Sequence, residues 1–155
     1  MTTRGLKTPE PLRVVFTKSL DLPSKSNLWD CNKAKTLVIY DSSTANESYL
    51  SRIPKCVEVE KVSSDNPELI SKILAKRGCN KVLWECGPNL ATAAIQSNCI
   101  QEIITFIAPK ILGGENSMNP FGDFEFEEMH EVIKLSDSQV SLIGNDICIK
   151  SLFKN

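Results

Sequence analysis

The sequence has a single histidine, His130, and none of its six cysteines stands in a Cys-x-x-Cys pair. Zinc sites usually take cysteine and histidine ligands at paired spacing, so we expect no metal centre. The sequence also offers no Ser-His-Asp triad, because no strained serine turn accompanies the one histidine. A metalloenzyme and a serine hydrolase are therefore both disfavoured.

Long hydrophobic runs and an excess of one charge are lacking as well. No apolar run approaches the ~20 residues that a spanning helix needs, and the N-terminus does not have the layout of a signal peptide. The formal net charge is −1, so we expect no broad attraction to nucleic acid or to membranes. These absences predict a cytoplasmic protein.

A disulfide framework is not expected in a chain of this length and hydrophobicity that has no secretion signal. Cys56 and Cys148 alternate with apolar residues in strand-like runs. Free cysteines are among the most often buried residues, so both are predicted to be small core side chains.

The 155 residues, 41% of them hydrophobic, are enough for one globular domain that spans 1–155. Predicted strands alternate with helices through about Leu112, and all-β character follows. The expected strands lie at 12–18, 36–43, 55–62, 82–84, 101–114, 132–143 and 147–153. The last two are joined by turn dipeptides at Gly144-Asn145-Asp146, which predict an antiparallel hairpin. We expect an α/β fold, with a mostly parallel sheet flanked by helices and an antiparallel pair at its end.

The clearest helix is predicted in "SDNPELISKILAKRGCN". Asp65 or Asn66 can cap it, and Pro67 suits its first position. Gly78 can end it in a left-handed conformation. A shorter helix is expected in "NESYLSRI".

The stretch "KVLWECGPNLATAAIQ" carries the strongest chemical signal. A strand ends at Glu85, and a helix that begins at Pro88 or Asn89 would aim unpaired N–H groups at a ligand docked on Gly87. Such a helix start suits a phosphate or a diphosphate. Glu85 would repel phosphate, so it more plausibly accepts hydrogen bonds from another part of the ligand. The alternative is a plain turn, with Glu85 facing water or a lysine.

Other polar segments are weaker candidates. The acidic run "GDFEFEEMHE", which contains His130, is expected to be a solvated loop or helix edge. Gly113-Gly114 is either a simple turn or a second point of close approach to a ligand.

The runs "LWECGPNLATAAIQ" and "IQEIITFIAPKILGG" resemble the reductase domain of the bifunctional pyrimidine deaminase/reductase of riboflavin biosynthesis. They share a strand, a Glu, a small residue, Gly-Pro-x-Leu-Ala, a helix and an "APKllGG"-like strand. The N-terminal "TTRGLKTPEPLRVVFTKSLDLP" and the closing "GNDICIKSLF" also match the family pattern, so the resemblance covers essentially the whole chain.

The resemblance implies a dihydrofolate-reductase-like fold and an NADPH-dependent reductase. Its substrate would be 5-amino-6-(5-phosphoribosylamino)uracil, whose ribosylamino sugar becomes ribitylamino. Arg4 and Glu85 would bind the substrate, and no catalytic residue is identified. Lys18, where many family members have a serine, could meet the cofactor's 2′-phosphate. The remaining cofactor residues would be Gly87, Pro88, Asn89, Leu90, Ala91, Thr92 and Ala93.

The same resemblance implies that the first strand–helix–strand of the fold, and the deaminase half, are missing from this chain. We expect a homodimer, or association with a chain that supplies the missing segment. The alternative functions are a nucleotide-binding module without turnover, an inactive fragment of the enzyme, and a reductase of the same fold acting on another pterin or pyrimidine.

Overall fold

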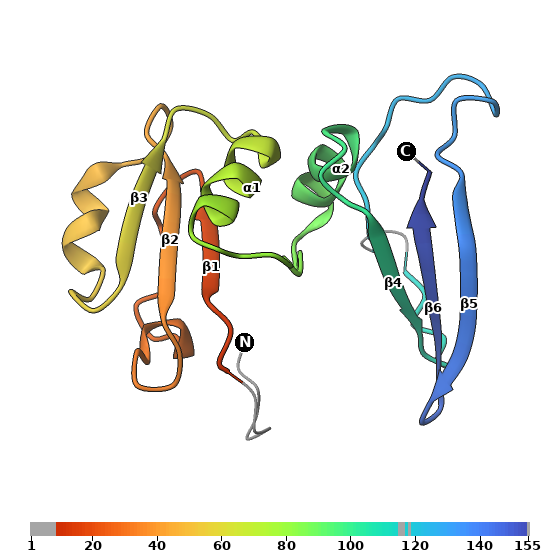
Figure 1. Cartoon of the computed structure of the whole chain (residues 1–155), viewed down its shortest axis with the longest axis horizontal. Helices are drawn as coiled ribbons and strands as arrows, with labels where there is room; N and C mark the ends of the chain where they lie inside the picture. Colours follow the sequence, from red (N-terminus) through yellow and green to blue (C-terminus); the bar gives the residue numbers. More distant parts are fainter. Residues whose placement is uncertain (1–8, 115–116, 118, 155) are drawn as a thin grey trace. The chain divides into compact units, whose positions relative to one another are not determined.

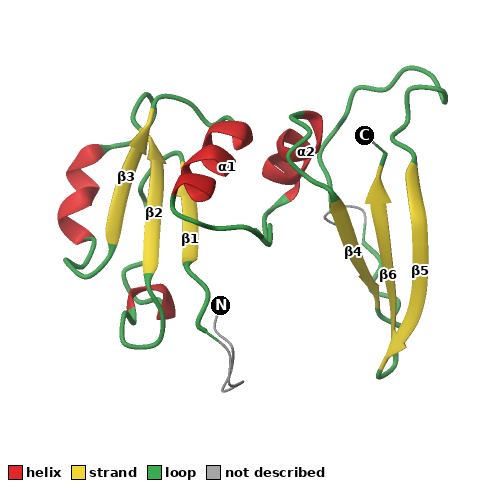
Figure 2. Ribbon diagram, viewed as in Figure 1, coloured by secondary structure: helices red, strands yellow, loops and turns green. Residues whose placement is uncertain are grey.

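The computed structural model describes residues 9–114, 117 and 119–154. The chain divides into two compact units, an N-terminal unit of residues 1–65 and a C-terminal unit of residues 66–155. Each is described by itself, and Figures 1 and 2 show the elements of both. Within the described residues, none of the helices is both long and apolar enough to cross a membrane.

The N-terminal unit contains a three-stranded parallel sheet in the order β1-β2-β3. The strands are β1 (Arg13–Thr17), β2 (Thr36–Asp41) and β3 (Glu58–Val62). All six residues of the central strand are buried, and Leu37, Val38 and Ile39 are wholly inaccessible. A near-continuous apolar run is what a strand buried on both faces requires. The predicted strands 12–18, 36–43 and 55–62 are thus confirmed.

Two 3₁₀-helices accompany this sheet, η1 (Asn27–Trp29) and η2 (Glu47–Arg52). The second is the short helix expected in "NESYLSRI", in its tighter form. A hydrophobic cluster of Leu20, Val38, Tyr40 and Val57 is packed against residues from both helices. One face of the sheet therefore has a core of its own.

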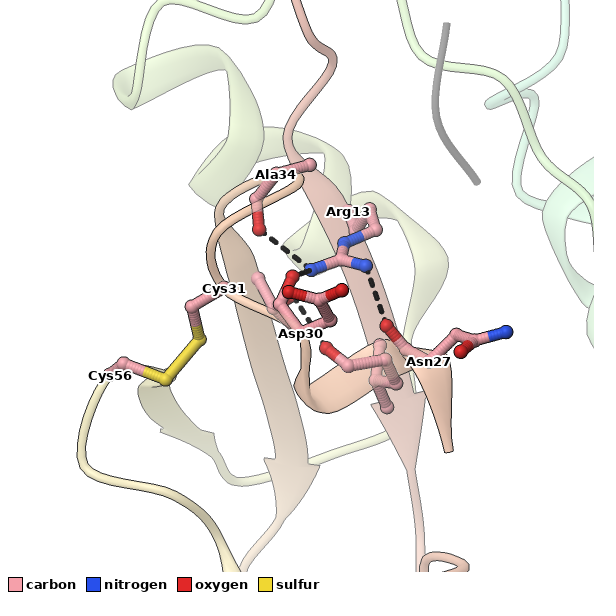
Figure 3. The surroundings of a disulfide bond; sticks show 8 residues. Arg13, Asn27, Asp30, Cys31, Ala34 and Cys56 are labelled. Atoms are coloured by element: carbon pink, nitrogen blue, oxygen red, sulfur yellow. Dashed lines mark hydrogen bonds between the residues drawn. A yellow bond between two sulfur atoms is a disulfide. The ribbon is translucent and has the colours of Figure 1, made fainter. Parts of the chain in front are cut away.

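A buried arginine and a disulfide hold the connections of this unit (Figure 3). The Arg13 guanidinium donates hydrogen bonds to three backbone oxygens, those of Asn27 (2.8 Å), Asp30 (2.8 Å) and Ala34 (2.6 Å). Next to them, Cys31 is bonded to Cys56, with their Cα atoms 6.3 Å apart. The arginine therefore orders the segment that leads into β2. The disulfide links that segment to the one that leads into β3.

The cysteine predictions are therefore corrected in part. Cys56 is exposed and disulfide-bonded, not a core residue, because it precedes β3 in the turn that faces Cys31. Cys148 is buried, as predicted.

The C-terminal unit contains two helices and a three-stranded antiparallel sheet in the order β4-β6-β5. Its elements are α1 (Pro67–Lys76), α2 (Pro88–Gln96), β4 (Glu102–Ile107), β5 (Leu135–Ile143) and β6 (Asp146–Phe153). Asn66 caps α1 by accepting a hydrogen bond from the Glu68 N–H, and Gly78 follows the helix with a φ of +84°. The α/β class and the closing hairpin are confirmed, with the strands divided between two sheets.

The strand predicted at 82–84 is not formed. The segment is extended chain without a ladder, and Val82 and Leu83 are 39% and 63% exposed. A strand exists only where another strand pairs with it, and no described strand pairs with this segment. The prediction of a strand at 82–84 is therefore wrong for the described residues, because an apolar run forms a strand only where a second strand pairs with it.

Candidate functional site

The N-terminus of α2 presents free backbone donors. Gly87 is its N-cap residue, in an extended conformation and without a side chain to cap the helix, and Pro88 occupies the first turn. The intrahelical ladder begins with the Ala91 N–H, which donates to the Gly87 oxygen at 3.0 Å. The N–H groups of Asn89 and Leu90 lie before this point, where a helix supplies no acceptor. The predicted anion site would depend on these two N–H groups.

The space beside Gly87 is open on the side where a side chain would lie. A Cβ atom added to Gly87 would meet nothing within 4 Å, and the φ of this residue is −73°. Neither packing nor backbone conformation therefore requires a glycine here. A remaining reason for a glycine at position 87 is that it lets a ligand approach the backbone closely.

The predicted cofactor residues on α2 differ in exposure. Asn89 is exposed, whereas Leu90, Ala91 and Ala93 are half-buried. Thr92 is only 6% exposed, and its hydroxyl accepts a hydrogen bond of 2.9 Å from the Gly122 N–H. Consecutive side chains of a helix point in different directions, so residues 89–93 cannot all face one ligand. The N–H groups of the first turn point in one direction, so an anion at α2 would be held by the backbone there.

Glu85, the predicted substrate residue, is exposed just before α2. The other predicted substrate residue, Arg4, lies outside the described residues. Glu85 lies three positions before Pro88, the first residue of α2. The predicted substrate residue and the predicted anion site are therefore neighbours in sequence.

Lys18 belongs to the N-terminal unit, where it follows β1. Its ammonium forms an ion pair with Asp65. The hydrogen bond and the charge of Asp65 raise the pKa of Lys18, and Asp41 adds to the effect. The lysine is therefore cationic at neutral pH, but a phosphate would have to replace the Asp65 carboxylate.

A second polar feature, which was not among the predicted site residues, lies at the carboxyl end of this parallel sheet. Asp41 ends β2, and its carboxylate accepts hydrogen bonds from the hydroxyl (2.7 Å) and the N–H (2.9 Å) of Ser43. These bonds lower the pKa of Asp41. The signal was present in "YDSS", since an Asp followed by Ser at the second position favours such a turn.

The C-terminal unit also has a groove of about 990 Å³. Its lining includes apolar residues of α2 and β4, the unpaired segment 80–84, and the free cysteines Cys79, Cys86 and Cys99. Burial raises the pKa of the Cys86 thiol, which disfavours the nucleophilic thiolate. Among the described residues, no group of three or more His, Cys, Asp or Glu side chains is placed to hold a metal.

Comparison with known proteins assigns a family to this arrangement. The sequence model of the RibD C-terminal domain matches residues 1–149. The chain belongs to this family. The Glu85 to Ala93 stretch lies inside the matched range, so the free helix start is part of a RibD C-terminal domain.

Two relatives are named as riboflavin biosynthesis proteins. RibD of Synechocystis is 40% identical over 148 residues, which cover 94% of this chain and 40% of that protein. The chloroplastic protein PYRR of Arabidopsis thaliana is 34% identical over 154 residues, 99% of this chain and 26% of PYRR. A third relative, from Archaeoglobus fulgidus, is named 2,5-diamino-6-ribosylamino-4(3H)-pyrimidinone 5′-phosphate reductase. It is 29% identical, over 72% of this chain and 51% of its own length.

Solved structures agree on the fold. RibD of Acinetobacter baumannii superposes with a TM-score of 0.75 at 20% identity, over 94% of this chain and 38% of that one. A pyrimidine reductase-like protein of Corynebacterium diphtheriae gives the same TM-score at 21% identity, over 94% of this chain and 62% of its own. The RibD C-terminal domain described here thus spans only part of the length of the proteins it matches.

Proposed function

We propose that this RibD C-terminal domain is the reductase of riboflavin biosynthesis. It would use NADPH to reduce the ribosylamino sugar of 5-amino-6-(5-phosphoribosylamino)uracil to the ribitylamino product. The observation that carries the proposal is the uncapped start of α2, with open space at Gly87 and the exposed Glu85 just before it. Its occurrence in a member of the RibD C-terminal domain family supports a nicotinamide cofactor at that place.

The residues of the helix start fit the diphosphate of such a cofactor. The amides of Asn89 and Leu90 would donate to it, and the positive end of the helix dipole would favour its charge. NADPH supplies the hydride when it is bound. The chain's own part would be positioning, since held geometry replaces the entropy cost of bringing two reactants together.

The substrate would be oriented by groups of both signs. Glu85 would accept hydrogen bonds from its hydroxyl or amino groups, and Arg4 would hold its phosphate by charge-assisted hydrogen bonds. Lys18 would meet the 2′-phosphate of NADPH after exchanging its bond to Asp65. These three roles rest on the family resemblance and on the charges at these positions.

A second substrate is favoured by the relative from Archaeoglobus fulgidus, which is named for the 2,5-diamino pyrimidinone phosphate. The two substrates differ in the ring, not in the sugar that is reduced. The choice between them would therefore depend on contacts to the pyrimidine ring.

The test is NADPH oxidation by the full-length protein with each of the two substrates. The proposal expects substrate-dependent oxidation of NADPH, with the uracil compound preferred. NADPH binding without turnover of either compound would instead identify a nucleotide-binding module. Absence of both binding and turnover would contradict the proposal.

Localisation and assembly stay proposals as well. We keep the cytoplasm as the expected compartment, although the plant relatives are named as chloroplastic; cell fractionation decides between the two. A homodimer, or a chain that supplies further strands, would cover the exposed apolar side chains of the C-terminal sheet, and sedimentation at several concentrations distinguishes them.

A further inference from the structure

The first turn of α2 is bonded to a segment thirty residues further along the chain. The Gly122 N–H donates to the Thr92 hydroxyl at 2.9 Å and to the Pro88 backbone oxygen at 3.3 Å. Both acceptors belong to the start of α2, one turn apart. A single amide therefore ties the connection between β4 and β5 to the helix start that is proposed to bind NADPH.

Thr92 is suited to this contact and not to a ligand. Its side chain is 6% exposed, and a buried hydroxyl requires a hydrogen-bond partner. Gly122 supplies that partner. The Thr92 side chain therefore faces the segment that contains Gly122. Asn89, three residues earlier in the helix, is exposed.

Gly122 approaches the helix closely. A Cβ atom added to it would lie 3.4 Å from the Thr92 hydroxyl, 3.4 Å from the Asn89 side-chain oxygen and 3.9 Å from the Asn89 Cα. A methyl group would just make contact, and a larger side chain would push the segment away from the helix. The glycine thus permits the short hydrogen bond, and it also places the segment against Asn89.

The segment that is held in this way is aromatic. Phe121 lines the 990 Å³ groove of the C-terminal unit. Phe124 lies 6.2 Å from Phe121 and stacks on Phe126 at 5.2 Å, with 6° between the ring planes. We call residues 121–126 the aromatic segment. Gly122, the second residue of this segment, is the residue that contacts the first turn of α2, next to Asn89, whose N–H would bind the diphosphate.

We propose that Thr92 is a positioning residue, whose hydroxyl holds the aromatic segment against α2 through the Gly122 N–H and so fixes the shape of the cofactor site. The inference rests on the proposed function, because it assumes that NADPH binds at this helix start. It gives Thr92 an indirect role, in place of direct contact with the cofactor.

The experiment compares two substitutions of Thr92 in the full-length protein. Thr92→Val keeps the shape of the side chain and removes the acceptor, whereas Thr92→Ser keeps the hydroxyl. Thr105→Val is the matched control, because it removes an exposed hydroxyl on β4. The measurements are NADPH affinity by calorimetry, KM and kcat, melting temperature, and hydrogen exchange of the Gly122 amide by NMR.

Thr92→Val is expected to speed exchange at Gly122 and to weaken NADPH binding by about tenfold, the scale of one lost hydrogen bond. The loss should fall on the KM for NADPH more than on kcat. Thr92→Ser should restore both exchange and affinity to within about threefold of the unchanged protein. Thr105→Val should change neither.

Two results would overturn the inference and leave the proposed function standing. In one, Thr92→Val binds NADPH as tightly as the unchanged protein. In the other, Thr92→Val and Thr92→Ser lower NADPH affinity equally, alongside a lower melting temperature, which indicates a packing role only. Failure of the unchanged protein to bind NADPH would remove the proposed function, and the inference with it.

Discussion

The two units of this chain bury their sheets to different degrees. In the N-terminal unit the central strand β2 is wholly buried, whereas in the C-terminal unit Val140 and Leu142 of β5 are 69% and 74% exposed. Among the described residues, Val59 is the only exposed large hydrophobic side chain that the N-terminal unit contributes. Among the described residues, the unit that carries the proposed cofactor site is therefore the one that exposes more large apolar side chains.

The exposed surface follows from the strand register. Thr105 pairs with Ile149, which pairs with Val140, and Ile107, Ile147 and Leu142 form the next row. Strand side chains alternate between faces, so these six β-branched and leucine side chains share one face of the sheet. We propose that another chain or segment covers this surface, as exposed apolar patches often mark interaction sites. In both units, the local sequence is enough to form the helices and strands. The burial of their apolar side chains depends on what packs against each sheet.

The largest expected effect concerns a cover for that apolar surface. Residues 1–155 alone should bind NADPH weakly or not at all and show no measurable turnover, because hydride transfer needs reacting atoms held about 3–3.5 Å apart. Addition of an upstream strand–helix–strand segment from a longer relative should restore both. Steady-state NADPH oxidation measures the difference, with a scrambled segment as the control. Efficient reduction by residues 1–155 would show that the cover is dispensable.

The next prediction concerns the stability of the N-terminal unit, whose central strand is buried. The disulfide between Cys31 and Cys56 closes a loop with a sequence separation of 25, which the chain-entropy model values at about 3.5 kcal/mol. Replacement of both cysteines by serine should lower the melting temperature by roughly 10 °C or more. Trp29 fluorescence in a Trp84→Phe background reports on this unit.

Cys79→Ser is the matched control for the disulfide, because Cys79 is a free cysteine in the other unit. It should leave the Trp29 transition in place. Equal melting temperatures with and without a thiol reductant would show that the disulfide does not stabilise the N-terminal unit.

A smaller effect is expected at the helix start. Gly87→Val should weaken NADPH binding by about 1.5–3 kcal/mol, the scale of charge-assisted hydrogen bonds, because the side chain fills the space that a diphosphate needs. The fold should persist, since an added Cβ meets nothing within 4 Å. Calorimetry on the extended chain measures the change, and Gly87→Ala should give an intermediate value. An unchanged affinity in a folded Gly87→Val protein would place the cofactor elsewhere.

The smallest effect separates substrate from cofactor. Glu85→Gln should lower kcat or raise the substrate KM by roughly 10–100-fold, which corresponds to about 1.4–2.8 kcal/mol. NADPH affinity should barely change, because in the proposed function Glu85 accepts hydrogen bonds from the substrate and not from the cofactor. Steady-state kinetics of the extended chain decide this, with the exposed Glu127→Gln as the control. Equal losses for substrate and cofactor, with a lower melting temperature, would point to a role in the strand–helix junction.

Local patterns were enough to predict most elements. The apolar run at 36–43 became the buried β2, Asn66 and Pro67 began α1, and Gly144-Asn145 joined β5 to β6. Each of these signals depends on residues that are neighbours in sequence. The start of α2 at Pro88 was predicted for the same reason.

Contacts between residues that are far apart in the sequence could not be predicted. Val82 to Trp84 has strand composition but no described partner, and Cys31 meets Cys56 only because two connections converge at one end of the parallel sheet. The bond between Thr92 and Gly122 spans thirty positions. No local pattern marks such contacts, because they depend on how the elements pack.

The central claim is that the first turn of α2 binds the cofactor diphosphate, and an NADPH titration of the ¹⁵N-labelled extended chain tests it most directly. The account predicts that the amide resonances of Asn89 and Leu90 shift most as NADPH binds, and that Gly87→Val suppresses these shifts. Saturable binding that leaves the Asn89 and Leu90 amides unmoved, with the largest shifts in another part of the chain, would contradict it.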